Sequence, residues 1–440
     1  MIPKTLLLAT AAGLAMTGAA AAQGGAGTGS AFGCTGLERA EPLAALEGRD
    51  GIFYRLNLDM RNNHALSPKT AEMIGAISAA LAARGTTLIY VPVPTKSLAM
   101  PEELPDTVAG YGFDLKVAET VWHDFLGKLE AQGVTTVDSM TAMRGVEEPA
   151  FLATDFHWSP EGARAVAEAV AETIRQNPAY DGIEKTDYRT EIGEMHQRFS
   201  TMRNMLQPYC ASSIPRVEMP WFETTAQGNS DTSGGIFASE SAGPPIALTG
   251  TSMSAEADFH FEGFLADAAD AAVADYAITG GNQFGGITSY LLSEDYHDNP
   301  PAFVVWENPV YNNLGEFGET PLRELTAAAA NTCTPLETTN PEPARLVAEI
   351  GADALPRDGY VRVDTGAPTG RQAEFTFTDA DGVEVSATIS RPSRWDATRW
   401  FYQYAAPLWS EELASVRVDL DRPARDGARL ELCTTKETQS

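Results

Sequence analysis

Cysteine and basic residues are scarce in this chain. Its 440 residues include four cysteines, and none of them stands in a Cys-x-x-Cys pair, which argues against a zinc or thiol redox site. Lysine and arginine number 31 against 60 aspartate and glutamate, for a formal net charge of -29. A phosphate backbone repels so acidic a chain, which argues strongly against a nucleic acid as its ligand. An anionic polymer would bind through a local basic cluster.

Long apolar runs are absent after the N-terminus. No later stretch approaches the roughly 20 apolar residues of a membrane span. The first residues have the layout of a secretory signal peptide, because Lys4 is followed by an apolar run over 5–19 and by the small residues 20–22. We predict a signal peptide over 1–22 and a periplasmic mature protein. An N-terminal anchor that is never cleaved is the alternative.

The chain after the signal peptide is longer than one typical domain of ~100–200 residues. We predict an α/β domain over 23–340 and a smaller β domain over 341–440. The region over about 177–243 has few periodic runs, and we interpret it as an insertion that forms a flap or a wall of a cleft.

The four cysteines are expected to form two disulfides, because the predicted compartment is oxidising. Three pairings are possible. We favour Cys34–Cys210 and Cys333–Cys433, since each bridge then closes within one of the two domains.

The first domain is predicted from alternating helix and strand patterns. Short apolar runs over 87–91, 246–248, 276–278 and 302–306 alternate with helical periodicity. Such units imply an α/β fold with a doubly wound, mostly parallel sheet and helices on both faces. Ligands bind these sheets at the carboxyl ends of the strands, where Ser252 follows the second run.

Beyond Cys333 the hydrophobic pattern changes to a period of two. Alternating runs at 360–363, 374–378 and 383–389 surround a hairpin turn signal at Asp381-Gly382. This region is predicted to be a small all-β sandwich.

Asp155 and His157 lie on a loop directly before a predicted helix. Ser159 is a good N-cap, Pro160 a favoured first residue and Glu161 a first-turn acid. An imidazole with a carboxylate two residues away fits the base and the orienting acid of a hydrolase-like site. The alternative is a capped loop with a structural histidine. Metal binding lacks a convincing third ligand, so no metal is expected.

Ser252, in Gly250-Thr251-Ser252, is the best candidate nucleophile. A tight strand-to-helix turn exposes its hydroxyl and leaves its own backbone N–H near the future oxyanion. Such turns also occur for purely geometric reasons. Ser254 is the second candidate.

These motifs in combination resemble a known family. The Asp-x-His before a Ser-Pro-Glu-Gly helix start, the later Gly-Thr-Ser turn, the segment Trp306-Glu307-Asn308-Pro309-Val310-Tyr311 and a β-rich tail bracketed by two cysteines are similar to AlgX-type alginate O-acetyltransferases. The wider group is the SGNH hydrolase-like superfamily. The resemblance spans about 34–433 and implies a periplasmic enzyme, without cofactors, that acetylates an exported polysaccharide such as alginate.

The resemblance also implies residue roles. Ser252 would be the nucleophile, His157 the general base and Asp155 its orienting carboxylate. Tyr311 is expected near the reacting carbonyl, with Asn282 as an oxyanion donor beside the Ser252 N–H. The permuted residue order and Gly-Thr-Ser in place of Gly-Asp-Ser depart from the usual superfamily layout, but the order agrees with the acetyltransferase branch. The implied partners are a membrane-bound acyl-transfer protein and an export complex.

The tail contains a cluster of basic and aromatic residues, which is unusual in so acidic a chain. Aromatic faces stack on sugar rings, and guanidinium groups bind uronate carboxylates. The alternative is that Trp400 and Tyr402 are core residues of the sandwich. The predicted polysaccharide contacts are Arg394, Trp395, Arg399 and Trp400, with Lys96 at a strand end as a further contact. By resemblance, the domain is similar to a carbohydrate-binding module.

Two other functions fit the same residues. In the first, water replaces the sugar hydroxyl and the protein is a secreted carbohydrate esterase. In the second, the protein is a non-catalytic polysaccharide-binding scaffold of an export complex. A monomer is expected in each case.

Overall fold

A parallel sheet forms the centre of the larger unit in the computed structural model, which describes residues 29–64, 66–227, 243–351 and 353–435. Within these residues, its five strands run in the order β4-β3-β9-β7-β8. They are β3 (Thr87–Val93), β4 (Thr135–Thr136), β7 (Ile246–Thr249), β8 (Val273–Asp275) and β9 (Phe303–Pro309). The strands β7 and β9 are buried throughout, as expected of a parallel sheet covered on both faces.

The predicted parallel sheet is confirmed, but one strand is misplaced in the prediction. The edge strand is Val273–Asp275, not 276–278. The side chain of Asp275 accepts a hydrogen bond from the Ala277 N–H (2.8 Å), and this turn ends the strand.

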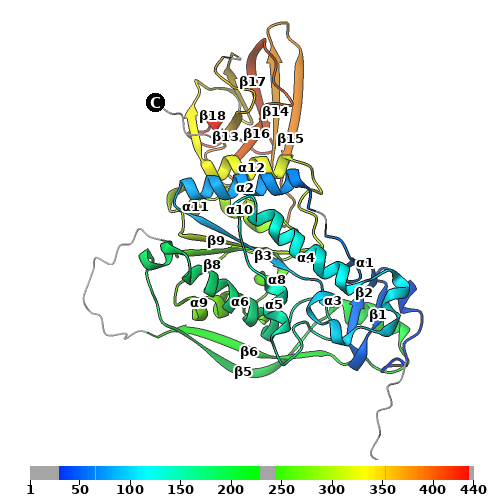
Figure 1. Ribbon diagram of the computed structural model, residues 1–440. Coiled ribbons are helices and arrows are strands. Elements are labelled where there is room, and N and C mark those ends of the chain that lie inside the picture. The colour runs from blue at the N-terminus through cyan, green and yellow to red at the C-terminus, as the bar shows by residue number, and fades with distance from the viewer. Residues whose placement is uncertain (1–28, 65, 228–242, 352, 436–440) are drawn as a thin grey trace, which may run out of the picture.

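Helices cover both faces of this sheet (Figure 1). The helices α2, α10 and α12 lie on one side, and α5, α6 and α9 on the other. The α-helices are α1 (Leu56–Asp59), α2 (Pro68–Ala83), α3 (Lys96–Ala99), α4 (Leu115–Glu130), α5 (Ser139–Arg144), α6 (Pro160–Arg175), α7 (Thr201–Leu206), α8 (Ser252–Ala255), α9 (Phe261–Ala269), α10 (Gly285–Leu291), α11 (Glu294–Asp298) and α12 (Thr320–Ala330). Short 3-10 helices are η1 (Leu37–Arg39), η2 (Arg49–Gly51), η3 (Pro101–Glu103), η4 (Asp106–Tyr111), η5 (Pro178–Gly182), η6 (Gln207–Tyr209) and η7 (Ala257–Phe259).

The predicted start of α6 is confirmed. The Ser159 hydroxyl accepts a hydrogen bond from the Gly162 N–H (3.1 Å), and Pro160 is the first helical residue. In the part of the chain that the structure describes, no helix combines the length and apolarity needed to cross a membrane. The signal peptide predicted over 1–22 lies outside the described residues.

Two antiparallel strands form a long arm along the lower edge of the larger unit (Figure 1). They are β5 (Tyr188–Arg198) and β6 (Val217–Ala226), both inside the region interpreted as an insertion. The Thr190 N–H donates to Asp267 of α9 (2.9 Å), which fixes the arm to the unit. The disulfide Cys34–Cys210, one of the two expected bridges, ties the segment between the strands to the N-terminal region, where β1 (Ala45–Glu47) pairs with β2 (Phe53–Arg55).

The smaller unit consists of two antiparallel sheets, which confirms the predicted all-β fold. In the described residues their orders are β10-β18-β13-β16 and β11-β12-β17-β14-β15. The predicted turn at Asp381-Gly382 joins β14 to β15, with Gly382 at φ 83°. The strands are β10 (Thr332–Pro335), β11 (Thr339–Glu342), β12 (Arg345–Glu349), β13 (Tyr360–Asp364), β14 (Gln372–Asp379), β15 (Glu384–Ser390), β16 (Trp400–Tyr404), β17 (Leu413–Leu420) and β18 (Arg429–Thr434). Strand β10 already pairs in this unit, ahead of the boundary predicted at 341.

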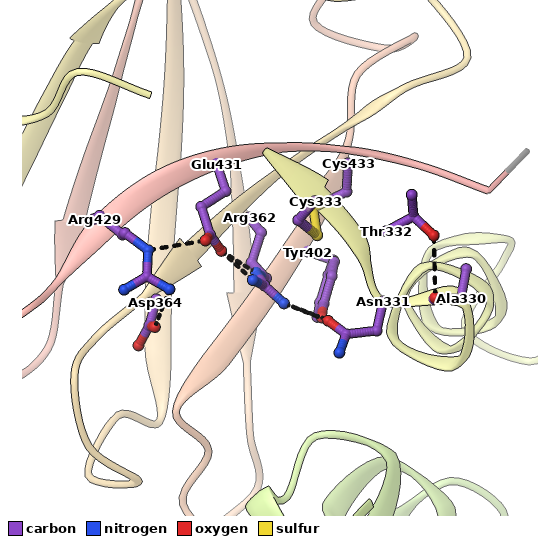
Figure 2. Close-up of a disulfide and its surroundings, with 10 residues drawn as sticks. All are labelled: Ala330, Asn331, Thr332, Cys333, Arg362, Asp364, Tyr402, Arg429, Glu431 and Cys433. Atoms are coloured by element: carbon purple, nitrogen blue, oxygen red, sulfur yellow. Dashed lines mark hydrogen bonds and ion pairs between the residues drawn. A yellow bond between two sulfur atoms is a disulfide. The ribbon is translucent and has the colours of Figure 1, made fainter. Parts of the chain in front are cut away.

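The second expected disulfide, Cys333–Cys433, joins β10 to β18 at a directly paired position. Figure 2 shows the side chains beside it, where Arg362 donates to Asn331 (2.7 Å) and to the Tyr402 hydroxyl (2.9 Å). Tyr402 is 1% exposed, so it is a core residue, but it packs in the hydrophobic cluster of the larger unit and not in the sandwich core that the alternative interpretation of the tail named.

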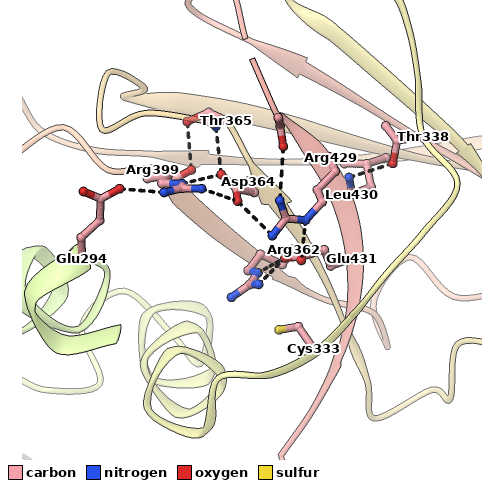
Figure 3. A network of polar contacts seen from close by, with 12 residues as sticks. Glu294, Cys333, Thr338, Arg362, Asp364, Thr365, Arg399, Arg429, Leu430 and Glu431 are labelled. Atoms are coloured by element: carbon pink, nitrogen blue, oxygen red, sulfur yellow. Dashed lines mark hydrogen bonds and ion pairs between the residues drawn. The ribbon is translucent and has the colours of Figure 1, made fainter. Parts of the chain in front are cut away.

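Arg399 and Trp400 both contact α11 across the two units, and the burial of Trp400 argues against the predicted polysaccharide contact at that residue. Trp400 is 6% exposed and stacks on His297 of α11 with ring centroids 4.0 Å apart. Arg399 pairs with Asp364 (2.7 Å) and with Glu294 of α11 (2.7 Å), in the polar network of Figure 3. Both side chains are therefore committed to contacts between α11 and the β unit.

Candidate active site

The loop before α6 brings Asp155 and His157 together in a buried position. The Asp155 carboxylate accepts from the His157 backbone N–H (3.0 Å), and its Oδ1 lies 2.6 Å from the imidazole Nδ1. Asp155 is 2% and His157 5% exposed. Burial alone would raise the pKa of Asp155, but the hydrogen bonds and charge of His157 lower it to about 2. The carboxylate is therefore ionised at neutral pH.

Ser252 completes the constellation from the other side. It is the first residue of α8, and its Oγ lies 2.9 Å from the His157 Nε2. Thr251 caps the helix and Gly250 links it to β7. A Cβ at Gly250 would lie 2.5 Å from a Glu307 side-chain oxygen, so any larger residue here would displace Glu307 from its place beside the turn. Aspartate, imidazole and hydroxyl thus form a chain of the kind that activates a serine nucleophile.

Two aromatic rings pack against the imidazole of His157. The His157 ring centroid lies 4.2 Å from that of Phe156 and 5.1 Å from that of Phe259. Arg198 of the β5 arm lies over the ring of Phe259, with its guanidinium carbon 4.6 Å from the ring centroid, and it pairs with Glu256 and Asp258, which follow α8. The arm therefore contacts the loop that follows Ser252 and α8.

Lys96 has a different place from the one predicted. It is 1% exposed, so it does not contact a polymer. Its ammonium donates to three carbonyl oxygens of the Asp155 loop, those of Leu152 (2.6 Å), Ala153 (3.0 Å) and Asp155 (3.1 Å). Burial lowers the pKa of Lys96 to about 7, while the nearby carboxylates act in the opposite direction. Lys96 therefore stabilises the Asp155 loop through hydrogen bonds from the protein interior.

A cleft of about 610 Å³ opens over the Ser252 hydroxyl. Arg394 reaches it from the β unit, and its guanidinium lies against Gly280, where a Cβ would come within 2.2 Å of a nitrogen. Phe199, which is 75% exposed, stands at the end of the arm. The lining residues are Asp155, Phe156, His157, Gln197, Arg198, Phe199, Thr201, Ser252, Glu256, Asp258, Thr279, Gly280 and Arg394.

Four other predicted site residues lie outside this lining. Tyr311 stacks on the Arg55 guanidinium (4.5 Å), which is itself paired with Asp59. Asn282 uses its side-chain oxygen to accept from the Phe284 N–H (2.8 Å). Trp395 is 9% exposed and packs beside Gly285. The hydroxyl of Ser254 donates to Glu307 (3.1 Å), so Ser254 is not the group that faces His157.

Glu307 is the residue whose role sequence reasoning missed. It belonged to the segment that carried the family resemblance, but it received no function. It is fully buried and accepts hydrogen bonds from Thr251 and Ser254, on both sides of Ser252. The local signal was weak, because a glutamate after an apolar run is ordinarily a solvated strand end.

The fold and this constellation define an SGNH hydrolase-like protein. A family model described as an SGNH hydrolase-like domain, acetyltransferase AlgX, matches residues 45–310. The chain belongs to this family.

Relatives with known names agree with this assignment. The chain is 29% identical over 272 residues to the alginate biosynthesis protein AlgX of Pseudomonas aeruginosa, which covers 62% of this chain and 56% of that protein. It is 28% identical to the probable alginate O-acetylase AlgJ of the same organism, over 58% of this chain and 68% of that protein. The match therefore spans little more than half the length of the AlgX relative.

A solved structure of Pseudomonas aeruginosa AlgX has the same fold. It superposes with a TM-score of 0.73 at 22% identity, and the match covers 89% of this chain and 94% of that one. Both units described above therefore have counterparts in that fold.

Proposed function

We propose that this protein is a periplasmic O-acetyltransferase that transfers acetyl groups to hydroxyls of an exported acidic polysaccharide, alginate or a similar polyuronate. The observation that carries the proposal is the continuous contact from Asp155 through His157 to Ser252 at the floor of an open cleft. Family membership and the names of the relatives support acetyl transfer as the reaction and an alginate-like polymer as the acceptor.

The first half-reaction forms an acyl-serine. His157 Nε2 takes the proton of Ser252 as the hydroxyl oxygen attacks the acetyl carbonyl, and Asp155 stabilises the imidazolium. The imidazolium then gives this proton to the leaving group as the tetrahedral intermediate collapses. In the second half-reaction a sugar hydroxyl loses its proton to His157 and attacks the acyl-serine, and the same proton returns to Ser252.

At the start of α8, one backbone N–H group is available to stabilise the tetrahedral intermediates. The Thr251 N–H donates to Glu307 and the Met253 N–H to the Thr251 hydroxyl, while the N–H groups of Ser254 and Ala255 donate to the Thr251 carbonyl. In the described residues the Ser252 N–H is left with no acceptor. We assign it to the oxyanion, with the Gly280 N–H, on the cleft wall, as a second donor in place of Asn282.

Arg394 is the residue of the predicted polymer cluster that we retain. It is exposed at the cleft, whereas Arg198 is occupied by two carboxylates. A guanidinium beside the nucleophile fits the carboxylate of a uronate acceptor. We propose that the β unit, by supplying this group, serves as a carbohydrate-binding domain. A membrane-bound acyl-transfer protein would deliver the acetyl group, since coenzyme A thioesters are not expected outside the cytoplasm.

The test is mass spectrometry of the mature protein incubated with a chromogenic acetyl ester, with and without an oligouronate, for wild type and Ser252→Ala. Acetylation of the sugar that disappears in Ser252→Ala supports the transferase. Acetate release alone, whatever acceptor is offered, makes the protein an esterase with the same triad. If neither acetylation of the sugar nor release of acetate depends on Ser252, the protein is a non-catalytic polysaccharide-binding scaffold.

A further inference from the structure

Glu307 lies beside the nucleophile turn because of strand register. In the sheet Thr249 of β7 pairs with Trp306 of β9, so the next residue of β9 comes next to Gly250. One carboxylate oxygen accepts from the Thr251 N–H (2.8 Å) and from the Ser254 hydroxyl (3.1 Å). The Thr251 hydroxyl lies 3.1 and 3.2 Å from the two oxygens. A single side chain thus contacts the residues on both sides of Ser252.

This carboxylate is buried without a counter-ion. It is 0% exposed and forms no ion pair with any described residue. The titratable groups that interact electrostatically with Glu307 are Asp275 of β8, Tyr90 of β3 and Tyr311 after β9. None of them is a cation. Burial raises the pKa of Glu307 to about 7, against the hydrogen bonds from Thr251 and Ser254. Burying a carboxyl group without a counter-ion costs folding free energy, so its presence here requires an explanation beyond the packing of the core.

The three donors match an acceptor that has no proton of its own. An ionised carboxylate accepts from one N–H and two hydroxyls without conflict, whereas an amide in its place would turn an NH₂ group toward one of them. The arrangement also explains the middle residue of Gly-Thr-Ser. A neighbouring strand supplies the carboxylate, and the threonine supplies two of the donors.

We propose that Glu307 is a positioning residue for Ser252: it holds the turn on β9, directs the Thr251 N–H away from the cleft and keeps the Ser252 hydroxyl in line with His157. This inference rests on the proposed function, in which Ser252 is the nucleophile. Glu307 does not touch the substrate, and its effect reaches the reaction through the turn.

The primary experiment measures how fast Ser252 is modified by a fluorophosphonate, followed by intact mass and peptide mapping. The variants are Glu307→Gln and, as a matched control, Glu319→Gln, which lies at the start of α12 away from the cleft. Displacement of the serine by about 1 Å costs on the order of a hundredfold. We expect labelling of Glu307→Gln to be slower by about this factor, with kcat for an acetyl ester reduced and KM little changed. The control should label like wild type.

A pH profile separates positioning from general weakening of the fold. If the ionised carboxylate holds the turn, the acid limb of the wild-type labelling rate contains the ionisation of Glu307, and Glu307→Gln lacks it. Equal labelling rates and equal pH profiles for wild type and Glu307→Gln would overturn the proposal.

Two further readouts keep the outcome decisive. If wild-type Ser252 resists labelling, the proposed function fails, but hydrogen exchange of the Thr251 N–H still tests the positioning. Faster exchange in Glu307→Gln supports it, and unchanged exchange overturns it. If Glu307→Gln does not fold, Thr251→Val is compared with Thr251→Ser, which keeps the hydroxyl. Slower labelling of the valine variant supports the proposal, and equal rates overturn it.

Discussion

The imidazole of His157 lies 2.9 Å from the hydroxyl of Ser252, although 95 positions separate the two residues in the chain. His157 arrives on the loop before α6, and Ser252 on the turn after β7. The second ring nitrogen contacts Asp155. The carboxylate end of this chain is closed to solvent, and the hydroxyl end opens into the cleft. A change at each residue of this hydrogen-bonded chain is therefore expected to have its own effect on activity or stability.

Replacement of Asp155 by asparagine should abolish most activity without unfolding the protein. The amide would favour the wrong imidazole tautomer and could not stabilise the imidazolium, for which losses of about 10⁴-fold in kcat are typical. Ester turnover and Ser252 labelling measure the effect. Asp124→Asn, in an exposed helical ion pair, is the control. Activity of Asp155→Asn within tenfold of wild type would contradict the proposed triad.

Stability between pH 4.5 and 7 should depend on Glu307. Its pKa in the folded state is about 7, above the ordinary value of 4.5, so the folded protein keeps a proton that the unfolded chain has released. Stability should therefore fall as the pH rises through this window, by on the order of 3 kcal/mol from this group. Denaturant unfolding at several pH values measures the fall. The free energy of unfolding should depend less steeply on pH in Glu307→Gln than in wild type. Equal pH dependence in the two proteins would contradict the raised pKa of the buried Glu307 carboxyl.

Lys96→Met should destabilise the protein and slow the reaction. The methionine fills similar space but removes the donors to the three carbonyl oxygens of the Asp155 loop. Hydrogen bonds from a charged group are worth about 1.5–3 kcal/mol each, but methionine avoids the cost of burying the ammonium, which offsets part of that sum, so a net loss on the order of 3 kcal/mol is expected. Thermal or urea unfolding checks this, with the exposed Lys128→Met as control. Unchanged stability together with weaker polymer binding would instead restore Lys96 as a polymer contact.

Arg394→Gln should weaken binding of an acidic oligosaccharide and leave hydrolysis of a small acetyl ester nearly unchanged. Its guanidinium reaches the cleft but has no part in the steps at Ser252. We expect about a tenfold higher KM for an oligouronate, with a smaller dependence on salt concentration. Arg422→Gln, on an exposed part of the β unit, should behave like wild type. An equal effect on both substrates would argue against carboxylate recognition.

The sequence alone was enough for the architecture and for much of the site. Helix α6 starts where the Ser159-Pro160 pair predicts, and the hairpin turns at Asp381-Gly382. Both signals are local, because capping and turn formation depend on neighbouring residues. Asp155 and His157 lie on one short loop, so the contact between their side chains could also be predicted from the sequence. The buried strands were visible as apolar runs.

Only the tertiary structure determined which polar side chains are exposed to solvent and which contact other parts of the protein. Lysine and tryptophan are typical of polymer-binding surfaces, yet Lys96 is buried against a loop and Trp400 against α11. Arg399 is partly exposed, but its guanidinium pairs with Asp364 and Glu294. Glu307 meets the Ser252 turn because two strands far apart in the chain pair in one register. Burial and long-range register depend on segments that meet only when the chain folds, so no local pattern encodes them.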